Sequence, residues 1–324
     1  MLLAAAGSLL VVLVTVTSIR MARRRLRYES WHLLHLYAYL GVGLALPHQV
    51  WTGTDFVSSA WARTYWWSLW VAAAAAVLVF RVGTPLWLSW RHQLRVVRVV
   101  TEAPGVVSVH LGGHRLDRLG ARAGQFLTLR FLDGPGWSRG NPYSLSAAPH
   151  PRLLRVTIAD AGDGSARAAR LRPGTRVLFE GPYGRLTAEA RTDTARPVVL
   201  LGAGVGVTPL RALLEEIDAP GRTTLVVRAR SSDDLLFSAE LEALAAARGV
   251  RVVPLVGPRA GEGSWLPRQY ASLGGATALR RIVPDIAEAE VYVCGPTAWA
   301  EAVSSAAREA GVPRRRVHEE RFAW

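Results

Sequence analysis

The stretch from Pro197 to Pro209 constrains the fold of this chain more than any other. Its sequence is Pro-Val-Val-Leu-Leu-Gly-Ala-Gly-Val-Gly-Val-Thr-Pro, an apolar run followed by closely spaced glycines and by a proline that suits the first turn of a helix. Further strands and helices alternate after it, with strands over 223–229, 250–256 and 290–294 and helices over 238–248 and 298–310. The pattern predicts a parallel, doubly wound α/β domain over residues 191–324.

The glycines of this turn, Gly202, Gly204 and Gly206, indicate a nucleotide site. A turn without Cβ atoms lets a pyrophosphate reach backbone N–H groups at a helix N-terminus. The spacing is Gly-x-Gly-x-Gly, so the strict Gly-x-Gly-x-x-Gly fingerprint is not met, and a glycine turn that binds nothing is the alternative.

The end of the next strand bears on which nucleotide would bind. An NAD site usually has a carboxylate here for the ribose 2′-hydroxyl, whereas an arginine accommodates the 2′-phosphate of NADP. Arg230 and Ser231 therefore favour NADPH, and Asp233 is the argument for NADH. Both nucleotides remain open.

The apolar excess of the chain lies almost entirely in its first ninety residues. Three apolar runs, over about 1–19, 31–51 and 65–88, are long enough to cross a bilayer, and Trp and Tyr residues rim the last two. The arginine cluster Arg20 to Arg27 follows the first run, which is the reverse of a signal peptide. We expect an all-α transmembrane domain over 1–94, in the cell (inner) membrane as a multi-pass protein, with the remaining chain in the cytoplasm.

Residues 95–190 show a different pattern, in which short β runs are separated by glycine and proline. This pattern predicts a small antiparallel barrel, so the expected fold is multi-domain. The net charge is +14 and every basic residue is arginine, but outside the cluster the charge is scattered, so we expect no nucleic-acid partner. Cys294 is the only cysteine, which excludes disulfides, a cysteine zinc site and an appended iron–sulfur domain.

Five motifs in order resemble the ferredoxin–NADP reductase superfamily. They are Ala123-Gly-Gln-Phe-Leu127, the Asn141-Pro-Tyr-Ser144 strand, Asp160-Ala-Gly-Asp-Gly-Ser165, Gly181-Pro-Tyr-Gly184 and Val291-Tyr-Val-Cys-Gly-Pro-Thr297. The resemblance implies an FAD-binding barrel followed by an NAD(P)-binding domain. It also implies that Tyr143 flanks the flavin ring and that the Ser144 hydroxyl lies near its N5. Asn141 stands where the family usually has an arginine.

The same resemblance implies the remaining site residues. Cys294 would lie beside the nicotinamide where hydride leaves, and either Phe322 or Trp324 would cover the flavin. The expected flavin contacts are Asn141, Pro142, Tyr143, Ser144, Gly162, Gly164, Ser165, Phe322 and Trp324. The expected NAD(P) contacts are Gly202, Gly204, Gly206, Thr208, Pro209, Arg230, Ser231, Cys294, Gly295 and Pro296, and Ser144 and Cys294 are the catalytic candidates.

The second apolar run resembles the ferric reductase and NADPH oxidase transmembrane family, in which two histidines of one helix each bind a stacked haem. His35 and His48 match that spacing and would lie about 20 Å apart along a helix. On a straight helix, however, their rings would point roughly 140° apart, and the kink at Pro47 is not predictable. His32 is better explained by packing or headgroup contact.

The three runs match only the last three of about six helices in that family. This chain therefore offers one axial ligand for each haem, and residues upstream or a membrane partner would have to supply the others, unless haem is not bound.

We therefore expect a membrane-anchored oxidoreductase that passes electrons from NAD(P)H through FAD, and through haem b, to an acceptor across the membrane. Ferric chelates, oxygen or a partner redox protein could be that acceptor. One alternative is a diaphorase-type NAD(P)H flavin reductase that uses the helices only as an anchor. The other is a non-catalytic nucleotide-binding membrane subunit. The sequence does not distinguish oligomeric states.

Overall fold

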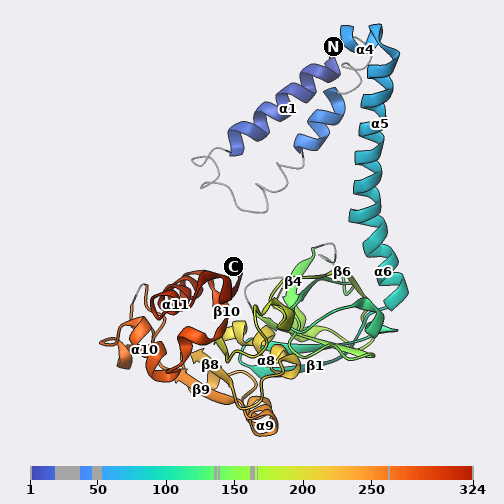
Figure 1. The fold of residues 1–324 in the computed structure, drawn as a ribbon. Coiled ribbons are helices and arrows are strands. Elements are labelled where there is room, and N and C mark those ends of the chain that lie inside the picture. The colour runs from blue at the N-terminus through green and yellow to red at the C-terminus, as the bar shows by residue number, and fades with distance from the viewer. Residues whose placement is uncertain are drawn as a thin grey trace. The chain divides into compact units, whose positions relative to one another are not determined.

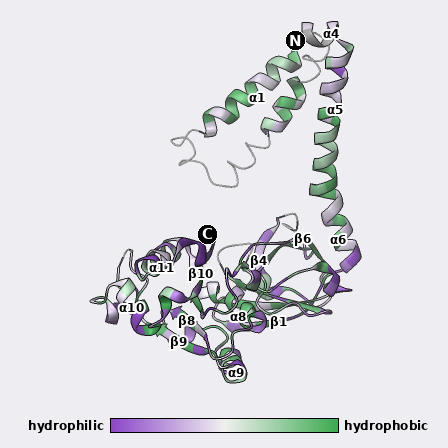
Figure 2. Ribbon diagram, in the orientation of Figure 1, coloured by the Kyte–Doolittle hydropathy of each residue, from purple (hydrophilic) through white to green (hydrophobic). Residues whose placement is uncertain are grey.

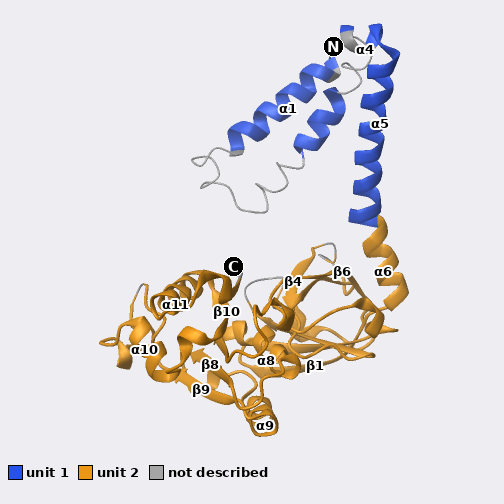
Figure 3. Cartoon of the chain, viewed as in Figure 1, with its two compact units in different colours: residues 1–82 blue, residues 83–324 orange. Residues whose placement is uncertain are grey.

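The computed structural model describes residues 2–18, 37–45, 53–134, 137, 139–160, 165, 167–261 and 263–322 (Figure 1). It divides into two compact units, Met1–Val82 and Gly83–Trp324 (Figure 3).

The first unit is helical where it is described. It contains α1 (Leu2–Ser18), a helix over 37–45, α4 (Thr54–Ser58) and α5 (Ala60–Val77). The first two of these helices cross in direct backbone contact, because a Cβ atom added at Gly41 would lie 2.8 Å from the Gly7 carbonyl oxygen. Small residues at a close crossing are typical of helices that pack in lipid.

One described helix, Ala60–His92, is long and apolar enough to cross a membrane. It runs through α5, the π-helical segment η1 (Leu78–Gly83) and α6 (Thr84–His92). Figure 2 shows the hydrophobic residues along α5, and no residue of α5 is buried. The predicted span over 65–88 lies within it. The apolar part of α1, Ala4–Thr17, is shorter than the roughly 20 residues that a crossing requires. The predicted 31–51 span lies mostly outside the described residues, so the three-helix transmembrane domain stays a prediction.

Gly83–Trp324 begins with a barrel of two antiparallel sheets. One sheet has the order β1 (Arg95–Ala103), β2 (Val106–Gly112) and β5 (Leu153–Ala159), and the other has the order β4 (Asn141–Ser144), β3 (Phe126–Phe131) and β6 (Val177–Tyr183). Bridges from Arg95 to Arg176 and from Leu145 to Val156 join them. Short 3₁₀ turns complete this part: η2 (Leu116–Leu119), η3 (Ala168–Arg170) and η4 (Ala188–Ala190). The predicted antiparallel barrel is confirmed.

Helix α6 is part of the barrel rather than of the apolar segment before it. The Phe179 backbone N–H donates to Ser89 Oγ at 3.1 Å, and the His92 ring packs on Phe179. The division between the units therefore lies at Val82/Gly83, earlier than the boundary at residue 94 that the sequence predicts.

The second domain is a five-stranded parallel sheet with the order β11 (Val317–Phe322), β10 (Glu290–Pro296), β7 (Val198–Ala203), β8 (Thr223–Ala229) and β9 (Arg251–Val256). Helices α8 (Val207–Glu216) and α9 (Ser238–Arg248) cover one face through a buried cluster that includes Leu200, Leu213 and Cys294. Helices α10 (Gly275–Ile282) and α11 (Thr297–Glu309) cover the other, around Leu201 and Val303. Short 3₁₀ turns, η5 (Gly204–Gly206), η6 (Ser232–Asp234), η7 (Arg268–Tyr270), η8 (Ile286–Glu288) and η9 (Arg314–Arg316), connect these elements. The doubly wound prediction is confirmed.

Candidate functional site

The strand that carries the expected flavin contacts is β4, which pairs with β3. Ser144 is 5% exposed, and its Oγ has no hydrogen-bond partner among the described protein atoms. Burial raises the pKa of the neighbouring Tyr143 phenol, whose ring packs 6.4 Å from that of Phe131. Buried hydroxyls normally have a partner, so an unpartnered one beside a half-buried aromatic ring fits a strand that completes its contacts with a flavin.

The glycine turn connects β7 to α8 through η5, and Gly204 has a positive φ of 54°. A Cβ atom at Gly206 would lie 2.8 Å from the Gly295 Cα atom, so the turn packs directly on the Cys294-Gly295 segment. Thr208, in the first turn of α8, is 1% exposed, and its Oγ1 also lacks a described partner. The free N–H groups and the hydroxyl at this helix N-terminus suit an anionic pyrophosphate.

Cys294 lies on β10 between this turn and β11. Its Cα pairs with Gly202 on one side and with Glu320 on the other, and its side chain is fully buried. Burial raises the pKa of the thiol well above its usual value, and the Glu320 charge adds to the effect. Burial also raises the pKa of Glu320 to about 7. Cys294 is therefore a neutral thiol that is suited to contact and not to nucleophilic attack.

A cleft of about 720 Å³ lies between the barrel and the nucleotide domain, next to the flavin strand. Gln125 in its wall accepts a backbone hydrogen bond from Leu145, the residue after Ser144. The Glu320 side chain faces the same cleft. The lining residues are Arg122, Gln125, Gly184, Arg185, Leu186, Thr187, Glu189, Ala190, Arg315, His318, Glu319 and Glu320.

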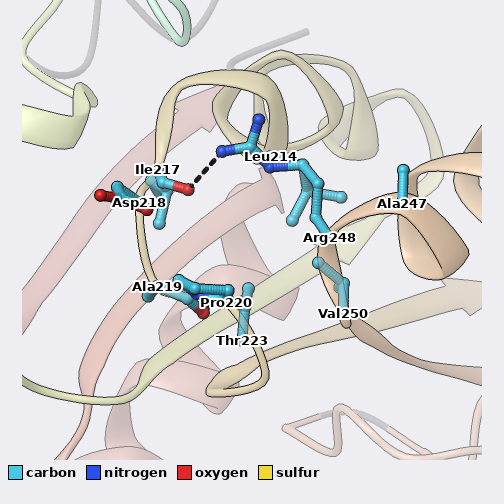
Figure 4. Close-up of a pocket in the computed structure, with 9 residues that line it drawn as sticks. All are labelled: Leu214, Ile217, Asp218, Ala219, Pro220, Thr223, Ala247, Arg248 and Val250. Carbon is cyan, nitrogen blue, oxygen red and sulfur yellow. Dashed lines mark hydrogen bonds between the residues drawn. The ribbon is translucent and has the colours of Figure 1, made fainter.

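A smaller cavity of about 280 Å³ lies where α8 ends and β8 begins (Figure 4). Arg248 crosses it and donates to the backbone carbonyls of Glu215 at 2.8 Å and Ile217 at 2.9 Å. This is the amino end of the strands, whereas ligands of doubly wound sheets bind at the carboxyl ends. The cavity is therefore separate from the nucleotide turn.

Three arginines gather at the carboxyl end of β8, and sequence reasoning had assigned only one of them. Arg228 is 6% exposed, and burial, followed by the charges of Arg259 and Arg230, lowers its pKa. Within the described residues, no ion pair joins any of the three to a carboxylate. Arg259 could have been predicted from its position shortly after β9, because β9 is the neighbour of β8 in the sheet.

Ser231 follows β8 and already has a side-chain partner. The Ser231 hydroxyl donates to Asp234 Oδ2 at 2.8 Å and its N–H donates to the same oxygen at 3.1 Å, as the cap of η6. Its hydroxyl is thus already used at this helix end. Arg228 Nη1 donates to the Leu255 carbonyl at 3.2 Å and Arg259 Nε donates to the Ser264 carbonyl at 2.9 Å, whereas the Arg230 side chain is exposed and is the group most accessible to a 2′-phosphate.

Several predicted residues are only partly placed. Ser165 Oγ lies 3.3 Å from Asp160 Oδ1, and the Phe322 backbone pairs with Pro296 at the end of β11. The described residues do not include Gly162, Gly164, Trp324, His35 and His48.

Comparison with known proteins identifies the family. The profile described as "Oxidoreductase NAD-binding domain" matches residues 200–305. The chain is 34% identical over 218 residues to "Ferredoxin--NADP reductase B" of Sorangium cellulosum, covering 62% of this chain and 84% of the relative. The chain belongs to the ferredoxin–NADP reductase family. It is also 30% identical over 298 residues to the "Flavohemoprotein" of Bordetella pertussis, covering 83% of this chain and 70% of the relative.

Solved structures agree with this assignment. A cytochrome P450 reductase from Amycolatopsis has a TM-score of 0.58 and 26% identity, covering 71% of this chain and 69% of its own. A ferredoxin NADP+ reductase from Neisseria gonorrhoeae with bound FAD and NADP has a TM-score of 0.57 and 22% identity, covering 71% of this chain and 97% of its own. This reductase-family chain is an NAD(P)H-dependent flavin oxidoreductase, with FAD-binding and NAD(P)-binding domains. This result argues against the alternative that the chain is a non-catalytic nucleotide-binding membrane subunit.

Proposed function

We propose that the chain is a membrane-anchored, diaphorase-type flavin reductase that oxidises NADPH and passes the electrons to a separate acceptor. The observation that carries the proposal is that one unit contains both the flavin strand, with Ser144 Oγ unpartnered, and the nucleotide turn, with Thr208 Oγ1 unpartnered. The relatives named as ferredoxin reductases and as reductase components of oxygenases support this reading.

The residues of the chain have distinct parts in this reaction. FAD, when bound, supplies the conversion of a hydride into single electrons. Tyr143 would offer its ring to the flavin, and the Ser144 hydroxyl would lie near N5. The N-terminus of α8 would hold the nucleotide pyrophosphate. Cys294 would contact the nicotinamide as a neutral thiol, and Glu320, with a pKa of about 7, could exchange a proton beside it.

The arginines at the end of β8 support NADPH as the nucleotide. A phosphate dianion would offset two of the three positive charges of Arg228, Arg230 and Arg259, whereas NADH would leave all three uncompensated. We expect Arg230→Ala to reduce kcat/KM for NADPH roughly 10- to 100-fold, since a hydrogen bond to a charged group is worth about 1.5–3 kcal/mol. NADH should change little. The control is Arg118→Ala, an exposed arginine on the barrel. Equal losses with both nucleotides would place the 2′-phosphate elsewhere.

The proposed acceptor is a partner protein, because relatives of the chain are named as ferredoxin reductases and as reductase components of oxygenases. Ferric chelates and oxygen are the alternatives. The test is steady-state oxidation of NADPH by the purified full chain with ferricyanide, an added ferredoxin, a ferric chelate or oxygen as the only acceptor. A chain that binds FAD but oxidises neither nucleotide with any of them would refute the proposal.

Haem-linked transfer across the membrane is the second candidate, and it rests on the spacing of His35 and His48.

The membrane anchor itself rests on the long apolar helix Ala60–His92 and on the close crossing at Gly7 and Gly41. In this proposal the flavin and nucleotide domains face the cytoplasm of the cell.

A further inference from the structure

A buried arginine on the barrel reaches across to the nucleotide domain. Arg155, on β5, is 7% exposed, and each of its guanidinium nitrogens has a partner. Its Nε donates to Ser146 Oγ at 3.0 Å, and its Nη2 donates to the Ser146 carbonyl at 2.7 Å. The Nη1 and Nη2 atoms bind the two carboxylate oxygens of Glu240, on α9, at 2.7 and 2.9 Å. A bidentate pair of this kind fixes both distance and orientation.

A second arginine completes a closed ring of contacts formed by Arg155, Ser146, Arg211 and Glu240. Arg211, on α8, donates to the same Ser146 carbonyl at 3.2 Å, and its Nε lies 2.8 Å from Glu240 Oε2. Its Nη1 also lies 2.8 Å from Glu215, whose other oxygen accepts the Ala148 N–H at 2.5 Å. Ser146 and Glu240 are thus each held by two arginines.

The position of this ring in the fold indicates which elements it holds together. Ser146 is two residues after Ser144, so the ring holds the continuation of the flavin strand. Helix α8 begins at the nucleotide turn, and α9 follows the strand end that carries Arg230. The ring therefore joins the flavin strand to both elements that would hold the nucleotide. None of its members lines the cleft beside Glu320.

We propose that Arg155, Arg211 and Glu240 are positioning residues that set the approach of the nicotinamide to the flavin, and so control the rate of hydride transfer and not the binding of either cofactor. The inference rests on the proposed function. Its physical basis is that transfer requires reacting atoms about 3–3.5 Å apart, and a misplacement of about 1 Å can cost on the order of 100-fold in rate. Because the ring joins the elements that would hold the flavin and the nicotinamide, a change in the ring would produce such a misplacement.

The test uses the full chain loaded with FAD, in the Arg155→Met, Glu240→Gln and double variants. Glu242→Gln is the matched control, since Glu242 is exposed on the same helix. The measurements are FAD content, the Kd of NADP+, the single-turnover rate of flavin reduction at saturating NADPH, and the isotope effect with deuterium at the transferred position.

We expect the rate to fall roughly 10- to 100-fold in both single variants, with Kd and FAD content within about two-fold. The isotope effect should increase, and the double variant should be no slower than the worse single one, because the residues act as a unit. Glu240→Gln keeps the side-chain shape at a site 37% exposed, so it tests the inference even if Arg155→Met does not fold.

An unchanged rate per bound flavin in Glu240→Gln would overturn the inference, as would a loss confined to Kd. A wild-type chain whose flavin NADPH does not reduce would instead overturn the proposed function, so the two failures are distinguishable.

Discussion

At the scale of single residues, His110 and Glu320 have opposite effects on the pH dependence of stability. Burial, followed by the charges of Arg98 and Arg155, lowers the pKa of His110 from 6.5 to about 4. The unfolded chain therefore binds a proton that the folded chain does not as the pH falls from 6.5 to 4, and stability decreases over this window. Glu320 is protonated in the fold from pH 4.5 to about 7, so its contribution decreases as the pH rises through that window.

We expect His110→Gln to remove the acid-side penalty. Relative to the wild type, the variant should gain about 3 kcal/mol in the free energy of unfolding between pH 6.5 and pH 4, since one pKa unit is worth about 1.4 kcal/mol. Chemical denaturation at several pH values measures it, and His114→Gln, at an exposed histidine, is the control. Parallel pH profiles for the wild type and His110→Gln would contradict the expectation.

The titration of Glu320 should also affect the pH dependence of the reaction rate. With a pKa of about 7 in the cleft, its carboxyl changes charge near neutral pH. We expect Glu320→Gln to remove a step near pH 7 from the pH profile of kcat with NADPH and ferricyanide. Glu189→Gln, at another carboxylate in the cleft wall, should retain the step. If both variants keep it, another group titrates there.

At the scale of elements, α6 shows that the reductase module starts earlier than its first strand. Leu94 is 1% exposed, Leu88 packs on the same core, and Ser89 Oγ accepts the Phe179 N–H. We expect a fragment over 83–324 to be more stable than one over 95–324 by roughly 3–5 kcal/mol, from two leucine side chains and one hydrogen bond. Thermal unfolding of both fragments with FAD measures the difference.

A point variant isolates the contribution of the hydrogen bond. Ser89→Ala in the 83–324 fragment should cost roughly 1–3 kcal/mol, because it leaves a buried N–H unsatisfied. Trp90→Ala, at a side chain 72% exposed on the same helix, is the control. Equal stability of the two fragments would mean that α6 does not stabilise the barrel.

The sequence was informative where local pattern decides the structure. The glycine turn and the alternating strands predicted both domains of the reductase module, since strand and turn chemistry is local. The ring around Ser146 could not be predicted, because Arg155 and Glu240 are 85 positions apart and no spacing connects them. Arg259 was missed for the same reason. Helix α6 was missed because its Leu and Trp residues continue the apolar pattern of the preceding span.

At the scale of the whole molecule, the ligand count gives a prediction about haem. Two stacked haems with paired histidine ligands need four imidazoles, and the apolar runs supply His35 and His48. We expect the chain as given to show flavin absorbance with little or no six-coordinate haem. Reduced-minus-oxidised spectra of the full chain, alone and with upstream residues added, measure this. A bis-histidine signal at two haems per chain would show that the ligand set was misassigned.

The contacts between the two domains also have a consequence for changing the enzyme. Hydrogen bonds and ion pairs from α8, from α9 and from Tyr292 of β10 connect the parallel sheet domain to the barrel, and among the described residues none comes from β8 or β9. The arginines proposed to choose the nucleotide lie at the ends of β8 and β9. Substitutions at these arginines, whether they arise in evolution or are designed in the laboratory, should therefore change the preference of the enzyme for NADPH or NADH. The geometry of electron transfer should stay as it is.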